Sequence, residues 1–575
     1  KIPAYRAAYP DWWTDGFGSA ARETAASRKT HSDMTAVEGL LSMAVLKDKC
    51  LPQATHQQIE HIHESLLFYD EHTFGASESV SDPLCENSQV QWGEKSAYAW
   101  EAVKRTQMLY ETSVGLLQGD LRRGKNPTLT IFNTLNWKRS EMLTVYIDFE
   151  VIPRNQFFEI TDFQGHSLKV QPIRYRREGC YYAIFAEDIP PMGYKTFEIV
   201  FKQPSTDTGT ITINNASIEN HFYKLQLNPD KGTIQSLYDK ELNCELVDSS
   251  SPWELGAFIY EKLGNRDQLA QYRLDDYNRT GLSECRIIDS SNGPIYQRIL
   301  LQGKSPGTDE AFGVNLEIKL YHDTKRIELE YAIKRLPETD PSGIYVAFPF
   351  QLPEGKLAFD VQGGTVISGK NQLEGTSTDW NTVQNFVSVQ NNQAQIIIGS
   401  SLIPLYQLGD INLGKFQYQK QYERPHVYSW VMNNYWNTNF KASQEGEFRW
   451  SYHLTSSVDP SNNLATKFGW SSRIPLYARV MPTGTENHKP TEYSAFHFEK
   501  DNFLMTSCTP SKEEGYILLN IREIDGKRTN LRILNEDGQT VPFTIVNAIE
   551  EKLENETSEH IFEGYQNKFI KIKRF

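Results

Sequence analysis

The chain has 575 residues and a formal net charge of −14 at pH 7, from 59 Lys and Arg against 73 Asp and Glu. This acidic balance argues against a protein that binds nucleic acid through the phosphate backbone, because such proteins need a basic surface. No apolar run approaches the ~20 residues of a membrane-spanning helix, so we expect no membrane partner. Hydrophobic residues make up 39% of the chain and charged residues 23%, which indicates a folded protein of several domains.

Six cysteines are scattered along the chain without a Cys-x-x-Cys pair, which excludes a disulfide scaffold and a cysteine-rich zinc module. The sequence begins Lys1-Ile2-Pro3 and shows no signal peptide. We therefore expect it to be cut from a longer protein. Its location stays open, because periplasm, exterior, a lumen and cytoplasm all suit an acidic chain without a membrane span.

Helical periodicity dominates the chain before residue 125. Apolar residues recur at spacings of three and four over residues 22–46, 54–70 and 95–121. Each apolar stripe must be covered by another element. Helices of this length can cover one another, so the sequence predicts a small helical bundle over residues 1–125.

After residue 126 the periodicity falls to two, and turn signals recur at short intervals. No convincing long amphipathic helix is predicted between 126 and 575. Such a chain is best buried as antiparallel sheets packed face to face. The predicted domains after the bundle are a small β-sandwich over 126–204, a large β-sandwich over 205–485 and a C-terminal β-sandwich over 486–575.

The first candidate for chemistry is the segment Pro10–Ala20, which holds two adjacent tryptophans and two aspartates before a helix. Sugars present flat C–H faces to an indole ring and hydroxyl groups to carboxylates. A buried tryptophan anchor with Asp15 or Ser19 as a helix cap explains the same residues. The composition leaves both interpretations open.

The second candidate is the segment Tyr69–Ala76, in which Asp70, Glu71 and His72 follow a helix directly. These side-chain types serve as metal ligands or as acid/base groups. A lone histidine is more often a capping or hydrogen-bonded residue. One histidine does not make a zinc site, which needs four ligands or three and a water.

The third candidate is the segment Tyr428–Phe440, where aromatic residues alternate with amides. Asn side chains can bond two neighbouring hydroxyl groups at once. A core strand whose Asn residues shape a bulge or turn is the alternative. Four Asn within residues 433–439 make a pure core strand a poor explanation.

The other histidines of the helical part are expected on solvated helix faces. His31 and Asp33 have the spacing of a metal-binding pair, but they lie within a predicted helix, where positions i and i+2 diverge. His56, His61 and His63 are expected on a helix surface in the same way.

In this order, the three segments resemble glycoside hydrolase family 38, the zinc-dependent retaining α-mannosidases. Residues 218–223 and 232–240 resemble the start of the family's large sandwich, so the resemblance covers essentially the whole chain. It implies a helical bundle followed by antiparallel β-sandwiches, the largest a galactose-mutarotase-like supersandwich. A catalytic barrel-like domain precedes the bundle in that family, and we expect this chain to start after it.

The resemblance implies a zinc site that this chain completes only in part. His72 matches the zinc-ligand histidine of the family's bundle. The family often has His-His-Asp where this chain has Glu71-His72-Thr73, so Asp70 or Glu71 would replace the missing Asp as a substrate contact. The nucleophilic Asp and a His-x-Asp zinc pair are expected in the preceding domain. We therefore assign no catalytic residue to this chain and expect it, by itself, to bind zinc weakly and to be inactive.

The resemblance also implies contacts to the substrate, an oligosaccharide or other α-mannoside. Trp13 matches an aromatic residue that lines the −1 subsite. Asn434, Trp436 and Asn439 match the family's motif in the large sandwich. A non-catalytic carbohydrate-binding or scaffolding protein is the alternative. A polysaccharide lyase, which also has helices before a large sandwich, needs far more than ~125 helical residues.

Overall fold

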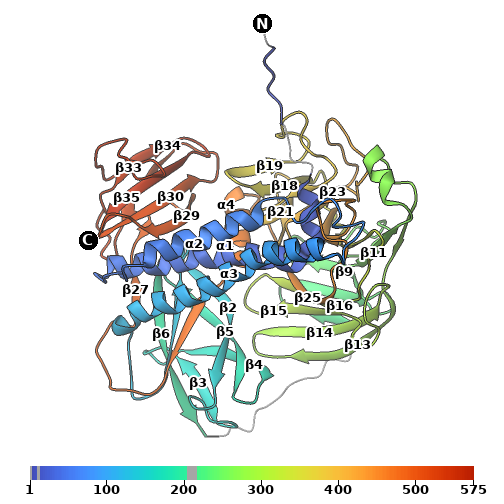
Figure 1. Ribbon diagram of the computed structural model, residues 1–575. Helices are drawn as coiled ribbons and strands as arrows, with labels where there is room; N and C mark the ends of the chain where they lie inside the picture. The colour runs from blue at the N-terminus through green and yellow to red at the C-terminus, as the bar shows by residue number, and fades with distance from the viewer. Residues whose placement is uncertain (1–2, 9–12, 204–215) are drawn as a thin grey trace.

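The computed structural model describes residues 3–8, 13–203 and 216–575. A short 3-10 helix, η1 (Thr14–Ala20), leads into α1 (Ala21–Leu46), which is followed by α2 (Thr55–Asp70), α3 (Glu86–Leu117) and the 3-10 turn η2 (Gln118–Asp120). Figure 1 shows α1, α2 and α3 lying side by side across the middle of the molecule, with β-sheets above and below them. The predicted helical bundle is thus confirmed.

Helix α1 is the central element, because its second half is buried on nearly every side. Met34, Val37 and Leu41 pack against apolar residues of α2 and α3. Leu40 and Met43 instead join the core of the C-terminal sheets. A helix that is apolar all round belongs in a core, and this one joins the bundle to the β domains.

The first β domain is one antiparallel sheet with the strand order β2-β5-β4-β3-β6-β1-β26, and β27 also pairs with β6. Strand β26 comes from the range predicted for the large sandwich, so the chain returns to this sheet late. The bounds are β1 (Thr128–Asn133), β2 (Arg139–Asp148), β3 (Phe157–Thr161), β4 (Ser167–Tyr175), β5 (Gly179–Ile189), β6 (Gly193–Lys202), β26 (Tyr477–Met481) and β27 (Glu492–Ser494).

The largest β domain is built from sheets that enclose one extended apolar core. Their strand orders are β10-β9-β8-β7, β12-β11-β17-β24-β23-β20 and β13-β14-β15-β16-β25-β22-β21-β18-β19. The short strands are β7 (Ser217–Glu219), β8 (Tyr223–Asn228), β9 (Thr233–Asp239), β10 (Cys244–Glu245), β12 (Tyr277–Thr280), β19 (Gly364–Ile367), β20 (Asn381–Thr382) and β23 (Leu405–Leu408). The longer strands are β11 (Phe258–Leu263), β13 (Ser283–Asn292), β14 (Tyr296–Lys304), β15 (Val314–Tyr321), β16 (Ile327–Arg335), β17 (Ser342–Phe348), β18 (Lys356–Val361), β21 (Phe386–Gln390), β22 (Gln395–Gly399), β24 (Val427–Asn433) and β25 (Gly446–Ser457).

The C-terminal domain packs on α1 and consists of antiparallel sheets with the orders β29-β30-β35-β33, β28-β32 and β31-β34. Its strands are β28 (His497–Phe498), β29 (Phe503–Pro510), β30 (Tyr516–Glu523), β31 (Thr529–Leu531), β32 (Ile533–Leu534), β33 (Thr544–Val546), β34 (His560–Phe562) and β35 (Asn567–Lys573). The β-rich second part of the chain is therefore as predicted. The exact domain boundaries stay a prediction.

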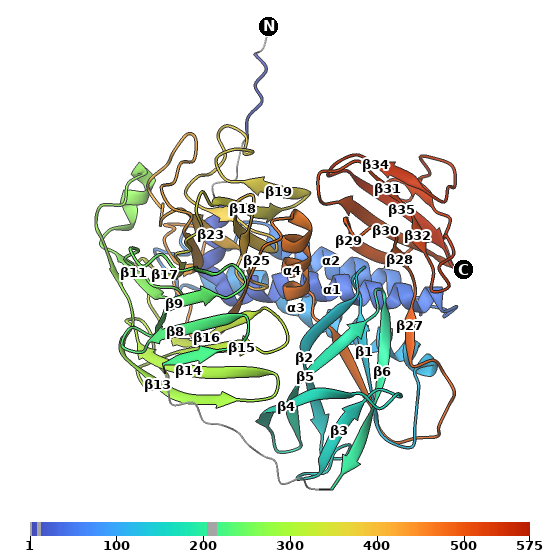
Figure 2. The same ribbon diagram turned by 180° about the vertical axis from the view of Figure 1, so that it is seen from behind.

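Among the described residues after 126 there is one α-helix, which has 12 residues and so does not contradict the expectation of no long amphipathic helix. Helix α4 (Asn462–Arg473) starts at Ser461, whose hydroxyl accepts a hydrogen bond from the Leu464 N–H and so caps the helix. Figure 2 shows α4 between the large sandwich and the C-terminal sheets, next to the helical bundle. Its short length hides its periodicity in the sequence. Among the described residues, no helix is long and apolar enough to span a membrane.

Candidate functional site

The candidate site forms where the start of the helical bundle meets the end of β24. Two glycines of η1 allow this helix to approach β24 and the loop after it closely. A Cβ atom on Gly16 would lie 2.2 Å from the ring of Phe440, and one on Gly18 would lie 2.3 Å from the Asn433 amide. Asn433 Nδ2 also donates a hydrogen bond to the Asp15 carbonyl, at 2.9 Å. The glycines of this segment therefore set the position of Trp13 and Asp15 over the sandwich.

An aromatic cluster brings together residues from the three segments singled out in the sequence. The ring centroid of Trp13 lies 5.0 Å from that of Trp436 and 5.5 Å from that of His72, which it meets edge-on. Trp13 is 37% exposed, so part of its side chain is accessible to solvent. Residues 10–12 of the first segment, Asp11 and Trp12 among them, lie outside the described residues.

His72 is held in place from both sides. Its Nδ1 lies 3.0 Å from Glu71 Oε1, and its backbone carbonyl accepts a hydrogen bond from Asn439 Nδ2 at 3.1 Å. Burial opposes ionisation of Glu71, but hydrogen bonds from Thr73 outweigh it and hold the pKa of this carboxyl below its ordinary value. Glu71 thus stays ionised beside the imidazole, while Asn439 acts on the His72 backbone.

Asp70 belongs to a different environment from Glu71 and His72. Its Oδ1 accepts a hydrogen bond from the Ser27 hydroxyl at 2.9 Å, and its Oδ2 lies 2.7 Å from His31 Nε2. Both partners come from α1. The structure therefore directs the Asp70 carboxylate toward the bundle and does not bring it into the aromatic cluster.

Asn434 is also separated from the cluster. Its side chain is buried, and all of its amide atoms are hydrogen-bonded within the protein. Its Nδ2 donates to three backbone carbonyls, at 2.7 to 3.1 Å, and its Oδ1 accepts from the Ser342 N–H at 2.7 Å. An Asn amide has only two protons to donate. The structure assigns it to fixing the loop after β24, the role that the sequence offered as the alternative.

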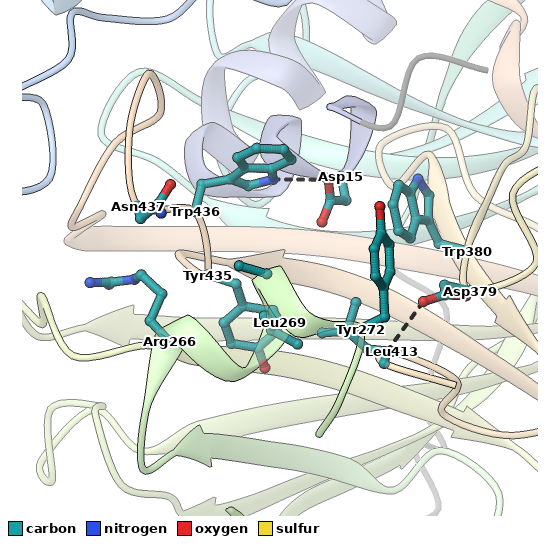
Figure 3. A pocket seen from close by; sticks show the side chains of 12 residues that line it. Asp15, Arg266, Leu269, Tyr272, Asp379, Trp380, Leu413, Tyr435, Trp436 and Asn437 are labelled. Atoms are coloured by element: carbon teal, nitrogen blue, oxygen red, sulfur yellow. Dashed lines mark hydrogen bonds between the residues drawn. The ribbon is translucent and has the colours of Figure 1, made fainter. Parts of the chain in front are cut away.

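A cavity of about 210 Å³ opens beside the cluster (Figure 3). Trp436 forms part of its wall and donates a hydrogen bond through Nε1 to Asp15 Oδ1 at 2.9 Å. The wall also includes Tyr435 and the 3-10 helix η3 (Arg266–Gln271). The remaining lining residues are Tyr272, Asp379, Trp380, Leu413, Gly414 and Asn437.

Two buried carboxyl groups face this cavity. Burial raises the pKa of Asp15 to about 7, against the lowering effect of the Trp436 N–H. Burial also raises the pKa of Asp379 to about 6, and the Gly414 N–H donates to its Oδ2 at 3.2 Å. Carboxyl groups with pKa values in this range can exchange a proton near neutral pH, and they can hydrogen-bond to hydroxyl groups in either protonation state.

Asp15 and Trp436 lie in segments that the sequence marks as candidates, whereas Asp379, Trp380 and Arg266 do not. The pair Asp379-Trp380 repeats the carboxylate-next-to-indole pattern that marked the first segment, and this was the available signal. Arg266 and Tyr272 lie in and beside η3, in a region without periodicity, so nothing local distinguished them.

The described residues do not by themselves fit a zinc ion. No group of three or more His, Cys, Asp or Glu side chains placed to hold a metal occurs in the part of the chain that the structure describes. A zinc site needs at least three protein ligands. His72 and Glu71 supply two neighbouring donors at most, so we derive no chemical step through a metal here.

Comparisons with known proteins place these features in a glycosidase family. Residues 11–117 match the model of the alpha mannosidase middle domain, and residues 218–416 match that of the glycosyl hydrolases family 38 C-terminal domain. The two matches together span more than half of the chain. This chain therefore belongs to glycoside hydrolase family 38, of which it carries the middle and C-terminal domains.

Solved structures agree with this fold. An alpha-mannosidase from Enterococcus faecalis V583 is 13% identical with a TM-score of 0.74, and the match covers 98% of this chain and 68% of that one. A family 38 protein from Enterococcus faecalis has the same identity and TM-score, with 71% of its chain covered. A search of the curated proteins finds no match.

Proposed function

We propose that this chain is the part of an α-mannosidase that binds and positions the sugar. The observation that carries the proposal is the meeting of Trp13, His72 and Trp436, from three distant segments, beside a cavity with a carboxyl at Asp15. Indole faces suit the C–H faces of a pyranose, and buried carboxyls suit its hydroxyl groups. The family of the chain and the name of its similar structure, an alpha-mannosidase, support the same substrate class.

The reaction in this proposal is retaining hydrolysis of an α-mannoside. Such a reaction needs a nucleophilic carboxylate and an acid/base carboxyl ~5–5.5 Å apart. We assign the nucleophile and a His-x-Asp zinc pair to a domain outside these 575 residues, with His72 as a further zinc ligand. Trp13 and Trp436 would hold the sugar ring, and Glu71 would orient the His72 imidazole.

The decisive test uses the full-length protein that contains this chain, with p-nitrophenyl α-mannoside as substrate. We expect His72→Ala to lower kcat/KM by at least about 100-fold, because loss of a metal ligand exceeds the 10–100-fold effect of an outer partner. Trp13→Ala should lower kcat/KM by about 10-fold or more through lost stacking. His61→Ala, on the exposed face of α2, is the matched control and should leave the rate unchanged.

Two outcomes would contradict this proposal. Full activity of the His72→Ala protein would remove the histidine from the site. Binding of mannosides without any turnover by the full-length protein would favour the non-catalytic carbohydrate-binding alternative.

The 575-residue chain alone offers a second prediction. We expect no hydrolysis of p-nitrophenyl α-mannoside and no more zinc retained after dialysis than in its His72→Ala variant, because a site missing most of its ligands binds the metal weakly. Metal content is measured by mass spectrometry against protein concentration. Turnover by the chain that His72→Ala abolishes would show that the catalytic groups lie within these residues.

A further inference from the structure

A second cavity, of about 380 Å³, lies where the helical bundle, the large sandwich and the C-terminal sheets meet. Its wall includes Asp360 of β18, Arg473 at the end of α4 and Arg522 of β30. His31 of α1 and His63 of α2 line it as well, so these two histidines are not simply on solvated helix faces. Figure 2 shows the elements involved converging around α4. The cavity is separate from the aromatic cluster and from the proposed mannosidase site.

Arg522 is the unusual group of this cavity. It is only 6% exposed, and its Nη2 lies 3.8 Å from Asp360 Oδ1, beyond hydrogen-bond distance. The ion pair with Asp360 is therefore loose, and Asp360 Oδ1 is buried without a hydrogen-bond partner. A buried ion pair without a direct hydrogen bond is costly, since buried charges are normally both paired and hydrogen-bonded.

Two further arginines increase the positive charge here. Arg473 donates through Nε to the Ser32 hydroxyl at 2.6 Å and through Nη1 to Asn385 Oδ1 at 3.2 Å, both neutral acceptors. Arg28 donates only to backbone carbonyls of the segment before β21, and burial followed by repulsion from Arg473 lowers its pKa to about 9. Arg473 and Arg522 thus share the single carboxylate of Asp360, with Arg28 close enough to Arg473 to repel it.

The other titratable groups at the cavity are already paired with each other. His31 Nε2 lies 2.7 Å from Asp70 Oδ2, and His63 Nε2 lies 2.6 Å from Glu38 Oε1. Asp70 also attracts Arg28, but the carboxylate that acts on Arg473 and Arg522 is that of Asp360. A neutral acceptor is also unused, because Asn520 Oδ1 is buried without a hydrogen-bond donor.

We propose that this cavity binds a small oxyanion that also carries a hydroxyl group, such as hydrogen phosphate or a sugar phosphate. The planar fork of an arginine matches the oxygens of a phosphate, and Arg522 and Arg473 would supply the donors. The hydroxyl of the ligand would donate to Asn520 Oδ1. The cavity has room for more than the anion itself, and the amides of Gln362 and Asn567 on its wall suit sugar hydroxyls.

The test is calorimetric titration of the protein with inorganic phosphate at constant ionic strength, with sulfate and a hexose 6-phosphate as parallel arms. We expect phosphate to bind more tightly than sulfate, which has no hydroxyl group. Arg522→Gln should weaken phosphate binding by about tenfold or more, since hydrogen bonds to charged groups are worth that much. Asp360→Asn should strengthen it by removing the competing carboxylate. Tighter binding of the hexose phosphate would support the role of the amides and identify the ligand as a sugar phosphate.

Two further variants test whether phosphate binds in this cavity. Arg528→Gln lies on the same domain, where its side chain is 67% exposed and pairs with Glu563, and it should leave phosphate binding unchanged. Asn520→Asp, which keeps the size of the side chain, should repel the anion even if Arg522→Gln does not fold. Absence of phosphate binding to the unmodified protein, or equal affinity in the Asn520→Asp and Asp360→Asn variants, would overturn the proposal. Neither outcome bears on the proposed mannosidase activity.

Discussion

Glu261→Ala is expected to lower the free energy of unfolding by about 3–5 kcal/mol, the cost of leaving a buried charge without its partner. Glu261 lies in β11 and is fully buried. Its carboxylate accepts hydrogen bonds from Arg279 Nε, from the Tyr435 hydroxyl at 2.6 Å and from the Tyr345 hydroxyl at 3.2 Å. Truncation strands the Arg279 guanidinium and two buried hydroxyls. Because Tyr435 lines the candidate cavity, the same change should loosen its wall.

Urea unfolding followed by tryptophan fluorescence measures this effect. The matched control is Asp340→Ala, which breaks the ion pair of the neighbouring Lys262. That pair spans 2.9 Å, but its side chains are 46% and 68% exposed, so its loss should cost no more than about 1 kcal/mol. The double variant Glu261→Ala/Arg279→Met should recover part of the lost stability, because it removes the stranded charge. Equal effects of the Glu261 and Asp340 variants would contradict this account of the buried network.

Asp15→Asn is expected to stabilise the protein more at high pH than at low pH. Burial raises the pKa of Asp15 from 3.8 to about 7, so the folded state holds the proton more tightly than the unfolded state. The carboxylate therefore destabilises the fold progressively as pH rises from about 4 to 7, up to a total of about 4 kcal/mol. Asparagine carries no charge and keeps the acceptor for the Trp436 N–H. Between pH 5 and pH 8 the stability of the Asp15→Asn variant relative to the unmodified protein should therefore increase by roughly 2–3 kcal/mol.

The measurement compares the unfolding free energies of the two proteins at pH 5, 6.5 and 8. Asp162→Asn provides the control, because its effect should not change over this pH range. Burial of Asp162 opposes ionisation, but hydrogen bonds from His166 and Gln164 outweigh it and lower the pKa of this carboxyl below 3.8. Its contribution to stability is therefore fully present from pH 5 to pH 8 and is lost only in more acidic solution, so the cost of the asparagine variant should be the same at all three pH values. If the gain in unfolding free energy from Asp15→Asn were the same at every pH, the pKa of the Asp15 carboxyl would not be raised in the folded protein.

Much of the fold followed from local patterns. The stripes at 22–46 and 54–70 match α1 and α2 within a residue, because their apolar side chains are buried against other helices or, at the end of α1, against the C-terminal sheets. Helix α3 begins at Glu86, nine residues before the predicted start, because its first turns are largely polar and gave no stripe. Helix α4 is too short to show a period. The late return of β26 to the first sheet leaves no trace in local sequence.

The candidate site was predictable only where residue types were unusual for their setting. Clustered tryptophans before a helix and clustered Asn after a strand marked Trp13 and Trp436, and the structure places Trp13 against both Trp436 and His72. Their neighbours Asp70 and Asn434 carry equally suitable groups, but hydrogen bonds with α1 and with the loop backbone occupy them. Asp379 reaches the cavity from a loop that no periodicity describes.

The sequence alone determined the class of fold, the family and the segments that gather at the site, because helix and strand periods and short motifs depend on nearby residues. The tertiary structure decided which polar groups lose water and which find partners. Burial and pairing of this kind raise the pKa of Asp15, engage the amide of Asn434 and hold Arg522 in a loose buried ion pair with Asp360. They depend on contacts between residues hundreds of positions apart, and no local pattern contains them.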